Sequence, residues 1–232
     1  MITNKTLLIP DVDFQTGQAI LIDKPIGWTS FKVVHKIRKA VKVKKVGHAG
    51  TLDPLATGLL IICMGKMTKS ITEFQNLPKT YSGIITLGKK SESMDLETKP
   101  FEEKPVENIS EEKIFEVRDK FLGEIFQTPP MYSAVKVKGK RLYKYARKGE
   151  TVERKQRKVN VYEFEIKKIE LPDVQFEIKC SKGTYVRVIA NDFGDELGCG
   201  GLLSKLRRER IGEYDVKQAL TVNEFENRFT RN

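Results

Sequence analysis

The stretch GHAGTLDPLATG at residues 47–58 decides how the rest of the chain is interpreted. Its glycines let a ligand approach the backbone closely, and Asp53 precedes a proline, which favours an extended backbone at that position. The stretch runs directly into the apolar residues 59–63, which are typical of a buried strand. A Gly-Thr-Leu-Asp-Pro segment is also ordinary turn chemistry. The loop alone therefore leaves two interpretations open, a simple turn and a ligand-binding loop that carries an acid.

On the N-terminal side of this loop the pattern predicts a strand followed by a helix. Residues 18–23 (QAILID) indicate a buried strand, and the turn at residues 24–27 (KPIG) ends it. Thr29 or Ser30 can then cap a helix. Its apolar residues recur at helical spacing and are expected to face the core: Phe31, Val34, Ile37 and Val41.

On the C-terminal side, helical and strand patterns alternate irregularly. Helices are predicted at residues 68–77, from Ser110 to Gly123, at residues 186–197 and after the capping box of Thr221 and Glu224. Strands are predicted at residues 81–87 and 174–180, the latter from strict apolar and polar alternation. Because there is no regular strand–helix–strand repeat, we expect an α+β fold with a central mixed, largely antiparallel sheet flanked by helices.

Composition limits the class of protein. The chain has 232 residues, a formal net charge of +11 and 39% hydrophobic residues, which suits one or two folded domains. No apolar run approaches the ~20 residues of a membrane span, and no signal peptide is recognisable at the start. The three cysteines, Cys63, Cys180 and Cys199, are far apart, so neither a disulfide scaffold nor a zinc site is expected. We therefore expect a cytoplasmic protein without a membrane partner.

The positive charge is concentrated in three clusters. Residues 32–45 hold seven basic side chains and no acid, residues 136–158 hold eleven against two acids, and residues 205–210 hold four. Any one such cluster could be a solvated surface, but three of them favour a face that binds a polyanion. Tyr143 and Tyr145 alternate with basic residues inside the second cluster, which suits RNA bases that stack on rings.

Few other chemistries are supported by the sequence. The two histidines, His35 and His48, have no metal-binding spacing, and no glycine-rich nucleotide-binding motif or GxSxG motif is present. We therefore expect no metal, no cofactor and no bound nucleotide. A second stretch, CSKGTYVR at residues 180–187, suggests that a strand ends at Gly183 and that Arg187 follows on the first turn of a helix. An arginine there can pair with a carboxylate and keep it ionised, although a surface arginine would look the same.

Taken together, these stretches resemble the TruB family of tRNA pseudouridine synthases. The resemblance covers residues 18–214 and includes these motifs in family order: KPxGxTS from Lys24, GHxGTLDPxATG from Gly47, KxY from Lys79, TPPxYSAVK from Thr128, GKRxY from Gly139, CSxGTYxR from Cys180 and LRR from Leu206. The GTLDPxATG loop is the most specific of these motifs, whereas KPxGxTS alone would be weak.

The resemblance implies a pseudouridine synthase fold with a catalytic cleft across the sheet, and an isomerase that converts uridine 55 in the T-loop of tRNA to pseudouridine. Asp53 would be the catalytic aspartate, either as a nucleophile or as a base. Arg187 would be its ion-pair partner, and Tyr81 would pack on the target base with its hydroxyl near C5. The base has to be flipped out of the loop first, and His48 matches the residue that fills the space left behind.

The resemblance also implies the RNA-binding residues. Beside His48 they are Lys24, Tyr185, Leu206, Arg141 and Lys136, with Leu206 as an apolar wall of the base pocket. Residues 124–158 would be an insertion that clamps the T-arm of tRNA, and the basic clusters would contact phosphates. We expect residues 1–232 to form a single catalytic domain that acts as a monomer, without the PUA domain that many bacterial members carry.

Two features depart from the family pattern or leave alternatives open. Family members often read Gly-Ala-His before the LRR motif, whereas this chain has Gly200-Gly201-Leu202, which loosens the assignment of RNA contacts there. The alternatives to a stand-alone synthase are a non-catalytic module that binds or folds tRNA, and a guide-RNA-dependent synthase that resembles dyskerin. A DNA-binding protein is the weakest interpretation, because no helix-turn-helix pattern is evident.

Overall fold

The computed structural model describes residues 1–6, 12–137 and 139–230. The chain divides into two compact units. Unit 1 comprises Met1–Tyr81 and Leu206–Asn232, and unit 2 comprises Ser82–Lys205. In the described residues ten strands form a mixed sheet in the order β14-β1-β3-β12-β4-β11-β10-β7, in which β13 pairs with β12 and β2 pairs with β3. Two further sheets have two strands each, β5-β6 and β8-β9. The predicted α+β class, with a mixed sheet and flanking helices, is confirmed.

Unit 1 contains the strands that surround the GTLDP loop. Its elements are α1 (Phe14–Gly17), β1 (Gln18–Lys24), α2 (Ser30–Val41), β2 (Val46–His48), β3 (Thr57–Met64), η1 (Gly65–Ser70), α3 (Ile71–Asn76), the start of β4 (Lys79–Leu87), the end of β12 (Gly201–Ile211), β13 (Tyr214–Asp215), η2 (Val216–Gln218), β14 (Leu220–Thr221) and α7 (Val222–Phe229). β1 pairs antiparallel with β3 and parallel with β14, whereas β3 pairs parallel with β12.

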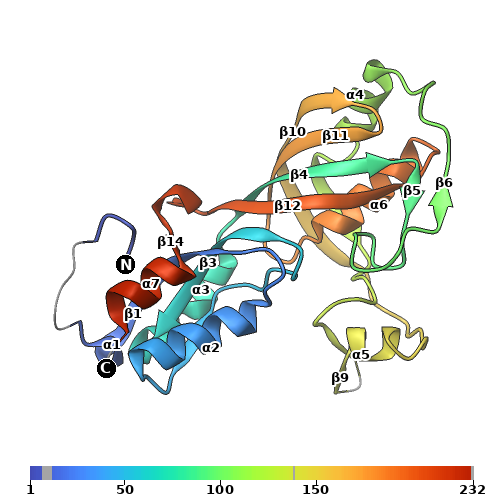
Figure 1. The fold of residues 1–232 in the computed structure, drawn as a ribbon. Helices are drawn as coiled ribbons and strands as arrows, with labels where there is room; N and C mark the ends of the chain where they lie inside the picture. The colour runs from blue at the N-terminus through green and yellow to red at the C-terminus, as the bar shows by residue number, and fades with distance from the viewer. Residues whose placement is uncertain (7–11, 138, 231–232) are drawn as a thin grey trace. The chain divides into compact units, whose positions relative to one another are not determined.

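Strands β1 and β3 are buried on both faces. Ile20 and Ile22 of β1 join a core with α2 and α7, whereas Leu21 joins a second core with α3 on the other face. This double coverage explains why residues 59–63 are continuously apolar rather than alternating. The predicted strand at residues 18–23 and the predicted capping box at Thr221 are both confirmed. α2 and α7 lie side by side in Figure 1.

Unit 2 carries the remaining strands and helices. Its elements are β5 (Lys89–Lys90), β6 (Glu102–Glu103), α4 (Glu111–Asp119), β7 (Gly123–Gln127), β8 (Lys136–Val137), β9 (Lys140–Arg141), α5 (Leu142–Ala146), β10 (Arg157–Glu170), β11 (Asp173–Cys180) and α6 (Val186–Glu196), with most of β4 and the start of β12. The predicted alternation is confirmed in β11, in which every second residue is buried. Four rings, Phe121, Phe164, Phe176 and Phe193, form the aromatic part of the core, with centroids 5.8–6.5 Å apart.

The structure corrects four details of the sequence prediction. Phe31 was expected in the core but is 68% exposed. The buried stripe of α2 is centred near Ile37, and at 100° per residue Phe31 lies about 120° away from that centre. The helix expected at residues 68–77 begins as the 3₁₀ helix η1, and α4 ends at Asp119 rather than at Gly123. The long strands β10 and β12 were not predicted at all.

Candidate active site and RNA-binding surface

The loop with Asp53 leaves strand β2 and returns into strand β3. The N–H of Ala49 still donates to Ile61 O at 2.9 Å, so the loop begins immediately beside β3. The N–H of Ala56 donates to Asp53 O at 3.1 Å, which closes a tight turn around the aspartate. Asp53 itself is half-buried. Its carboxylate is thus held at the end of two strands and remains partly accessible to a ligand.

Hydrogen bonds fix this loop on both sides of Asp53. The Ser30 hydroxyl donates to Leu52 O at 3.1 Å and accepts from Leu52 N at 2.9 Å. On the other side, Gly27 N donates to Pro54 O at 2.8 Å. Each neighbour of the aspartate is therefore tied to the KPxGxTS segment, which runs from the end of β1 to the first residue of α2. This explains structurally why the KPxGxTS segment accompanies the GTLDP loop.

Lys24 is the most unusual of these supports because its side chain is fully buried. Its ammonium donates to three carbonyl oxygens, Trp28 O at 2.6 Å, Pro25 O at 3.0 Å and Pro54 O at 3.3 Å. Burial lowers the pKa of Lys24 to about 8, although the nearby Asp53 carboxylate opposes that shift. The family resemblance implies a role in RNA binding for Lys24. In the structure, its side chain is buried and its hydrogen bonds to three carbonyl oxygens support the loop from inside the protein.

Arg208 is a second buried cation beside the loop, and the sequence pattern did not identify it as such. It is 1% exposed, and it donates from Nε to Leu59 O at 2.7 Å and from Nη2 to Gly50 O at 3.2 Å. β12 approaches β3 so closely here that a Cβ on Gly58 would overlap the backbone of Arg208. The expectation that the whole cluster at residues 205–210 contacts phosphates is wrong for Arg208.

The other arginines of that cluster have carboxylate partners within unit 1. Arg207 holds Asp23 with both Nη atoms, at 2.7 and 3.1 Å, and Arg210 lies 3.1 Å from Asp215. A bidentate arginine–carboxylate pair is stronger and more directional than a lysine contact. Because half-buried Asp23 immediately precedes Lys24, this pair also fixes the end of β1 beside the loop.

His48 lies at the start of the loop, on β2, and is half-buried. Burial lowers its pKa, and the positive charge of Arg208 lowers it further. Both causes disfavour the imidazolium, so His48 is neutral at neutral pH. Tyr81 on β4 and Leu206 on β12 are also half-buried, and they complete the predicted site residues of unit 1.

In unit 2, Arg187 stands on the first turn of α6, as predicted, and is 3% exposed. Its guanidinium lies 3.0 Å from the carboxylate of Asp95 and donates to Tyr132 O at 2.5 Å. Asp95 is itself buried, and its second carboxylate oxygen accepts from Glu97 N at 2.9 Å. Sequence reasoning missed Asp95, for which the nearby Ser91, Ser93 and Thr98 were the available signal.

Tyr185 immediately precedes α6, and its backbone is held by one side chain. Gln127 is buried and accepts from Tyr185 N at 3.0 Å while donating to Tyr185 O at 3.2 Å. The amide of Gln127 thereby satisfies the N–H of Tyr185, for which a helix start offers no intrahelical partner, and it shares the Tyr185 carbonyl oxygen with the N–H groups of Val188 and Ile189. This contact fixes the start of the helix that carries Arg187. It lies at the end of β7 and was not anticipated.

The insertion carries the other two predicted RNA contacts. Lys136 and Arg141 are exposed and stand opposite each other on the β8–β9 hairpin. Like charges in such a pair repel each other and destabilise the hairpin unless an anion lies between them. Lys140 lies 4.0 Å from the ring centroid of Tyr145, so a basic and an aromatic side chain of this cluster are in contact. Lys138, also part of this cluster, lies outside the described residues.

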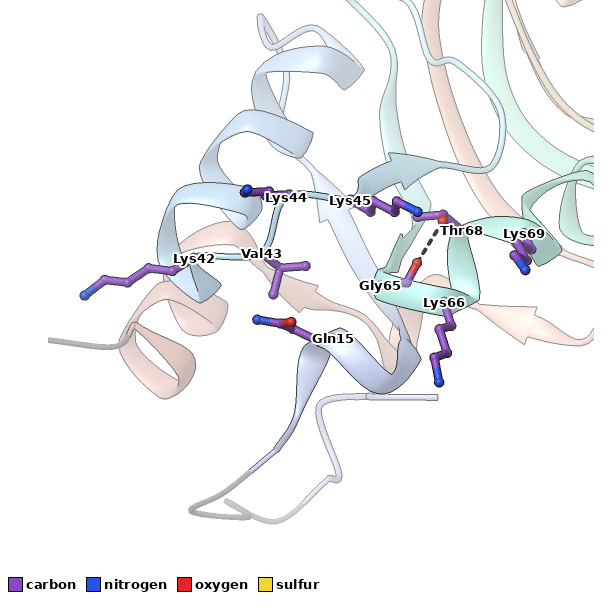
Figure 2. A pocket seen from close by; sticks show the side chains of 9 residues that line it. All are labelled: Gln15, Lys42, Val43, Lys44, Lys45, Gly65, Lys66, Thr68 and Lys69. Atoms are coloured by element: carbon purple, nitrogen blue, oxygen red, sulfur yellow. Dashed lines mark hydrogen bonds between the residues drawn. The ribbon is translucent and has the colours of Figure 1, made fainter.

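A lysine-rich cavity of about 680 Å³ lies in unit 1, at the end of β3 opposite the GTLDP loop (Figure 2). We call it the lysine pocket, and its five lysines come from two segments: Lys42, Lys44, Lys45, Lys66 and Lys69. Figure 2 shows their side chains spread around the hollow rather than meeting at one point. Within the described residues, none of the five forms an ion pair with an acid. The pocket is therefore a concentration of uncompensated positive charge.

The part of the chain that the structure describes shows neither a candidate metal centre nor a candidate membrane span. It contains no group of three or more His, Cys, Asp or Glu side chains that could hold a metal ion. It also contains no helix that is both long and apolar enough to cross a membrane.

Two family models together match most of the chain. The TruB family pseudouridylate synthase N-terminal domain matches residues 38–186, and the tRNA pseudouridylate synthase B C-terminal domain matches residues 187–232. Relatives named tRNA pseudouridine synthase B are similar over nearly their full length. The protein from Flavobacterium johnsoniae is 48% identical, over 92% of this chain and 96% of its own. The one from Chloroherpeton thalassium is 51% identical, over 90% of this chain and 88% of its own.

Solved structures agree with this assignment. A chain in a Cbf5–Nop10–Gar1 complex superimposes with a TM-score of 0.71 and 30% identity, over 97% of this chain and 61% of that one. A chain in an H/ACA ribonucleoprotein bound to a substrate RNA gives a TM-score of 0.69 and 28% identity, over 92% and 53%. This chain therefore spans little more than half the length of those solved chains. The fold and the loop define a pseudouridylate synthase. The chain belongs to the TruB family.

Proposed function

We propose that this chain is a tRNA pseudouridine synthase, an isomerase that converts uridine to pseudouridine at position 55 in the T-loop. Family membership and relatives of the same name at 48% and 51% identity support the reaction and the tRNA substrate. The observation that carries the proposal is the half-buried Asp53, in a loop fixed by hydrogen bonds at both neighbouring residues. We further propose that it acts as a monomer in the cytoplasm.

The reaction exchanges one bond of the uridine for another. The bond between N1 of the base and C1′ of the ribose breaks, and a bond between C5 and C1′ forms. C5 then loses its proton and N1 gains one, so the product is an isomer and no redox partner is needed. Asp53 initiates this exchange, either as a nucleophile or as a base. A fixed loop favours either route, because a carboxylate that is already positioned loses little entropy on reaching the reaction geometry.

The other catalytic assignments rest on the sequence motifs. Tyr81 packs on the flipped uracil and brings its hydroxyl to C5 for the final loss of a proton. Arg187 acts as the ionic partner that keeps Asp53 charged, and its own orientation is supported by Asp95 at 3.0 Å. His48 occupies the space that the flipped base leaves in the RNA loop. As a neutral imidazole it can stack between bases without the cost of burying a charge.

Each unit contributes RNA contacts of its own, unit 2 from the insertion and unit 1 from the lysine pocket. Lys136 and Arg141 contact phosphates of the T-arm, Tyr185 contacts the RNA, and Leu206 is an apolar wall of the base pocket. The insertion at residues 124–158 belongs to a single catalytic domain of residues 1–232. The five lysines of the lysine pocket add phosphate contacts beyond the catalytic loop, and their spread suits an extended RNA backbone better than a compact anion.

The direct test uses a T-arm stem-loop with tritium at C5 of each uridine. Purified protein should release one equivalent of tritium per RNA, and mapping should place the pseudouridine at the position equivalent to 55. A stem-loop with cytidine at that position is the matched control and should release none. Absence of tritium release from the uridine stem-loop would refute the proposal. Release only after a guide RNA is added would instead identify a dyskerin-like enzyme.

A further inference from the structure

The exposed apolar side chains of unit 1 lie around the catalytic loop. Among its described residues, four large hydrophobic side chains are strongly exposed, and apart from Met1 they are Ile26 at 66%, Phe31 at 68% and Leu55 at 38%. Single exposed apolar residues are common on proteins and need no explanation. Three that lie on the catalytic loop or beside the residues hydrogen-bonded to it form a group that indicates a binding partner.

The hydrogen bonds that fix the loop show how these three residues are grouped. Ile26 is one residue from Gly27, whose N–H donates to Pro54 O at 2.8 Å, and Leu55 is the residue after that proline. Phe31 follows Ser30, whose hydroxyl bonds both backbone groups of Leu52. Each exposed side chain is therefore one residue away from a bond that positions Asp53. The three side chains and the catalytic carboxylate therefore belong to one hydrogen-bonded part of unit 1.

The chemistry around these residues indicates an anion with apolar faces. Trp28 lies between Ile26 and Phe31 in the sequence, and the Lys32 ammonium is 4.1 Å from the centroid of its ring. Residues 24–45 contain no acidic side chain. A purely apolar partner would offer no counterion to the basic side chains of this stretch. Single-stranded RNA supplies both requirements, since its bases offer flat apolar faces and its backbone offers phosphates.

We infer that Ile26, Phe31 and Leu55 form an apolar rim that packs against unstacked bases of the RNA loop next to the flipped uridine. This inference rests on the proposed function, because it needs an RNA loop from which one base has been removed. Flipping breaks the stacking of the neighbouring bases and exposes their faces to water. The apolar rim replaces that lost stacking and covers apolar surface on both molecules. It therefore stabilises the complex in which Asp53 reaches its target.

The test measures RNA affinity in a protein that cannot turn over. Asp53→Asn is combined with Ile26→Ser and Phe31→Ser, and the dissociation constant for a fluorescent T-arm stem-loop is compared with that of Asp53→Asn alone. We expect binding to weaken by about 10-fold or more, the scale of one lost base–aromatic stack. Because no charge is removed, the slope of log Kd against log salt should stay the same. Phe31→Tyr should restore most of the affinity that Phe31→Ser loses.

A matched control uses an equally exposed phenylalanine elsewhere. Phe101 is 67% exposed on a loop of unit 2, and Phe101→Ser should leave both affinity and turnover unchanged. An unchanged Kd in the double-serine variant would overturn the apolar rim, and so would an equal loss in Phe101→Ser. The proposed function is tested separately by tritium release from the parent protein. Release there together with an unchanged Kd in the rim variant would refute only the present inference.

Discussion

Lys24 places a positive charge inside unit 1, where water does not reach it. Its ammonium satisfies three carbonyl oxygens, one of which belongs to Pro54 beside the catalytic aspartate. Burying a cation in this way is costly, and its lowered pKa reflects that cost. The cost is tolerated because the bonds hold the loop on which the proposed reaction depends. Lys24 therefore supports the loop that the proposed function needs, while its burial lowers the stability of the fold.

The pH dependence of unfolding should reveal this cost. The pKa of Lys24 is about 8 in the folded protein and 10.5 as its ordinary value. Between these values the unfolded chain binds more protons than the folded one, so stability from this group rises with pH across that window. We expect the unfolding free energy of wild type, relative to Lys24→Met, to rise by about 2–3 kcal/mol from pH 7.5 to 10. Urea titrations of both proteins measure it, and a flat or falling difference would contradict the account.

Asp95 should be needed to keep Arg187 in place. The pair is almost completely buried, with 3% and 9% of the side chains exposed, so neutralising Asp95 removes a buried carboxylate that water cannot replace. Asp95→Asn should cost about 3–5 kcal/mol of unfolding free energy and lower turnover. Asp215→Asn removes a comparable partner from the more exposed Arg210 and should cost less than about 1 kcal/mol. Similar losses of unfolding free energy in the two variants would show that burial of the ion pair does not determine its contribution to stability.

At the scale of elements, the contact between β3 and β12 depends on Gly58. Its φ of +102° is unfavourable for other residues, and a Cβ there would also overlap the backbone of Arg208. Gly58→Ala should therefore cost more than about 3 kcal/mol, the sum of strain and displaced packing. Gly198→Ala is the matched control, since Gly198 has a φ of +79° but open space around it. That variant should lose only about 1 kcal/mol, and equal losses would exclude the overlap as the cause.

Elements with an undisturbed period were predictable from the sequence. β11 alternates strictly between buried and half-buried residues, and α7 starts at a complete capping box, so one short pattern determines each. β10 was missed because irregularities after Val161 and Ile166 interrupt its alternation. β12 was missed because its basic residues suggested a surface cluster, whereas Arg208 points into the protein. Local patterns do not reveal such tertiary pairings.

The candidate site was predictable only in part, for the same reason. The motifs identified Asp53, Arg187 and the segment that begins at Lys24, because those residues stand in short, recognisable stretches. They did not identify Asp95 or Gln127, which support the site from positions 92 and 58 residues away in the chain. Residues that come together only after folding form no motif of fixed spacing in a single sequence.

At the scale of the whole molecule, the net charge of +11 is unevenly available to a ligand. Several arginines are internally compensated or buried, whereas the five lysines of the lysine pocket are not. Replacing Lys45, Lys66 and Lys69 by Ala should therefore make the slope of log Kd for tRNA against log salt shallower by about 2–3. Replacing Lys113, Lys120 and Lys167, each paired with a glutamate, should change that slope little. An unchanged slope in the first variant would show that the lysine pocket does not contribute to RNA binding.

The most direct test of the central claim compares tritium release by wild type, Asp53→Asn and Asp13→Asn under single-turnover conditions. Asp13 is an exposed helix cap in the same unit, so its variant controls for the loss of a carboxylate. We predict full release by wild type and Asp13→Asn. Release by Asp53→Asn should be slower by at least about 10³-fold, with T-arm affinity within about threefold of wild type. Release by Asp53→Asn at a rate near that of wild type would show that another residue carries the chemistry, and would contradict the account.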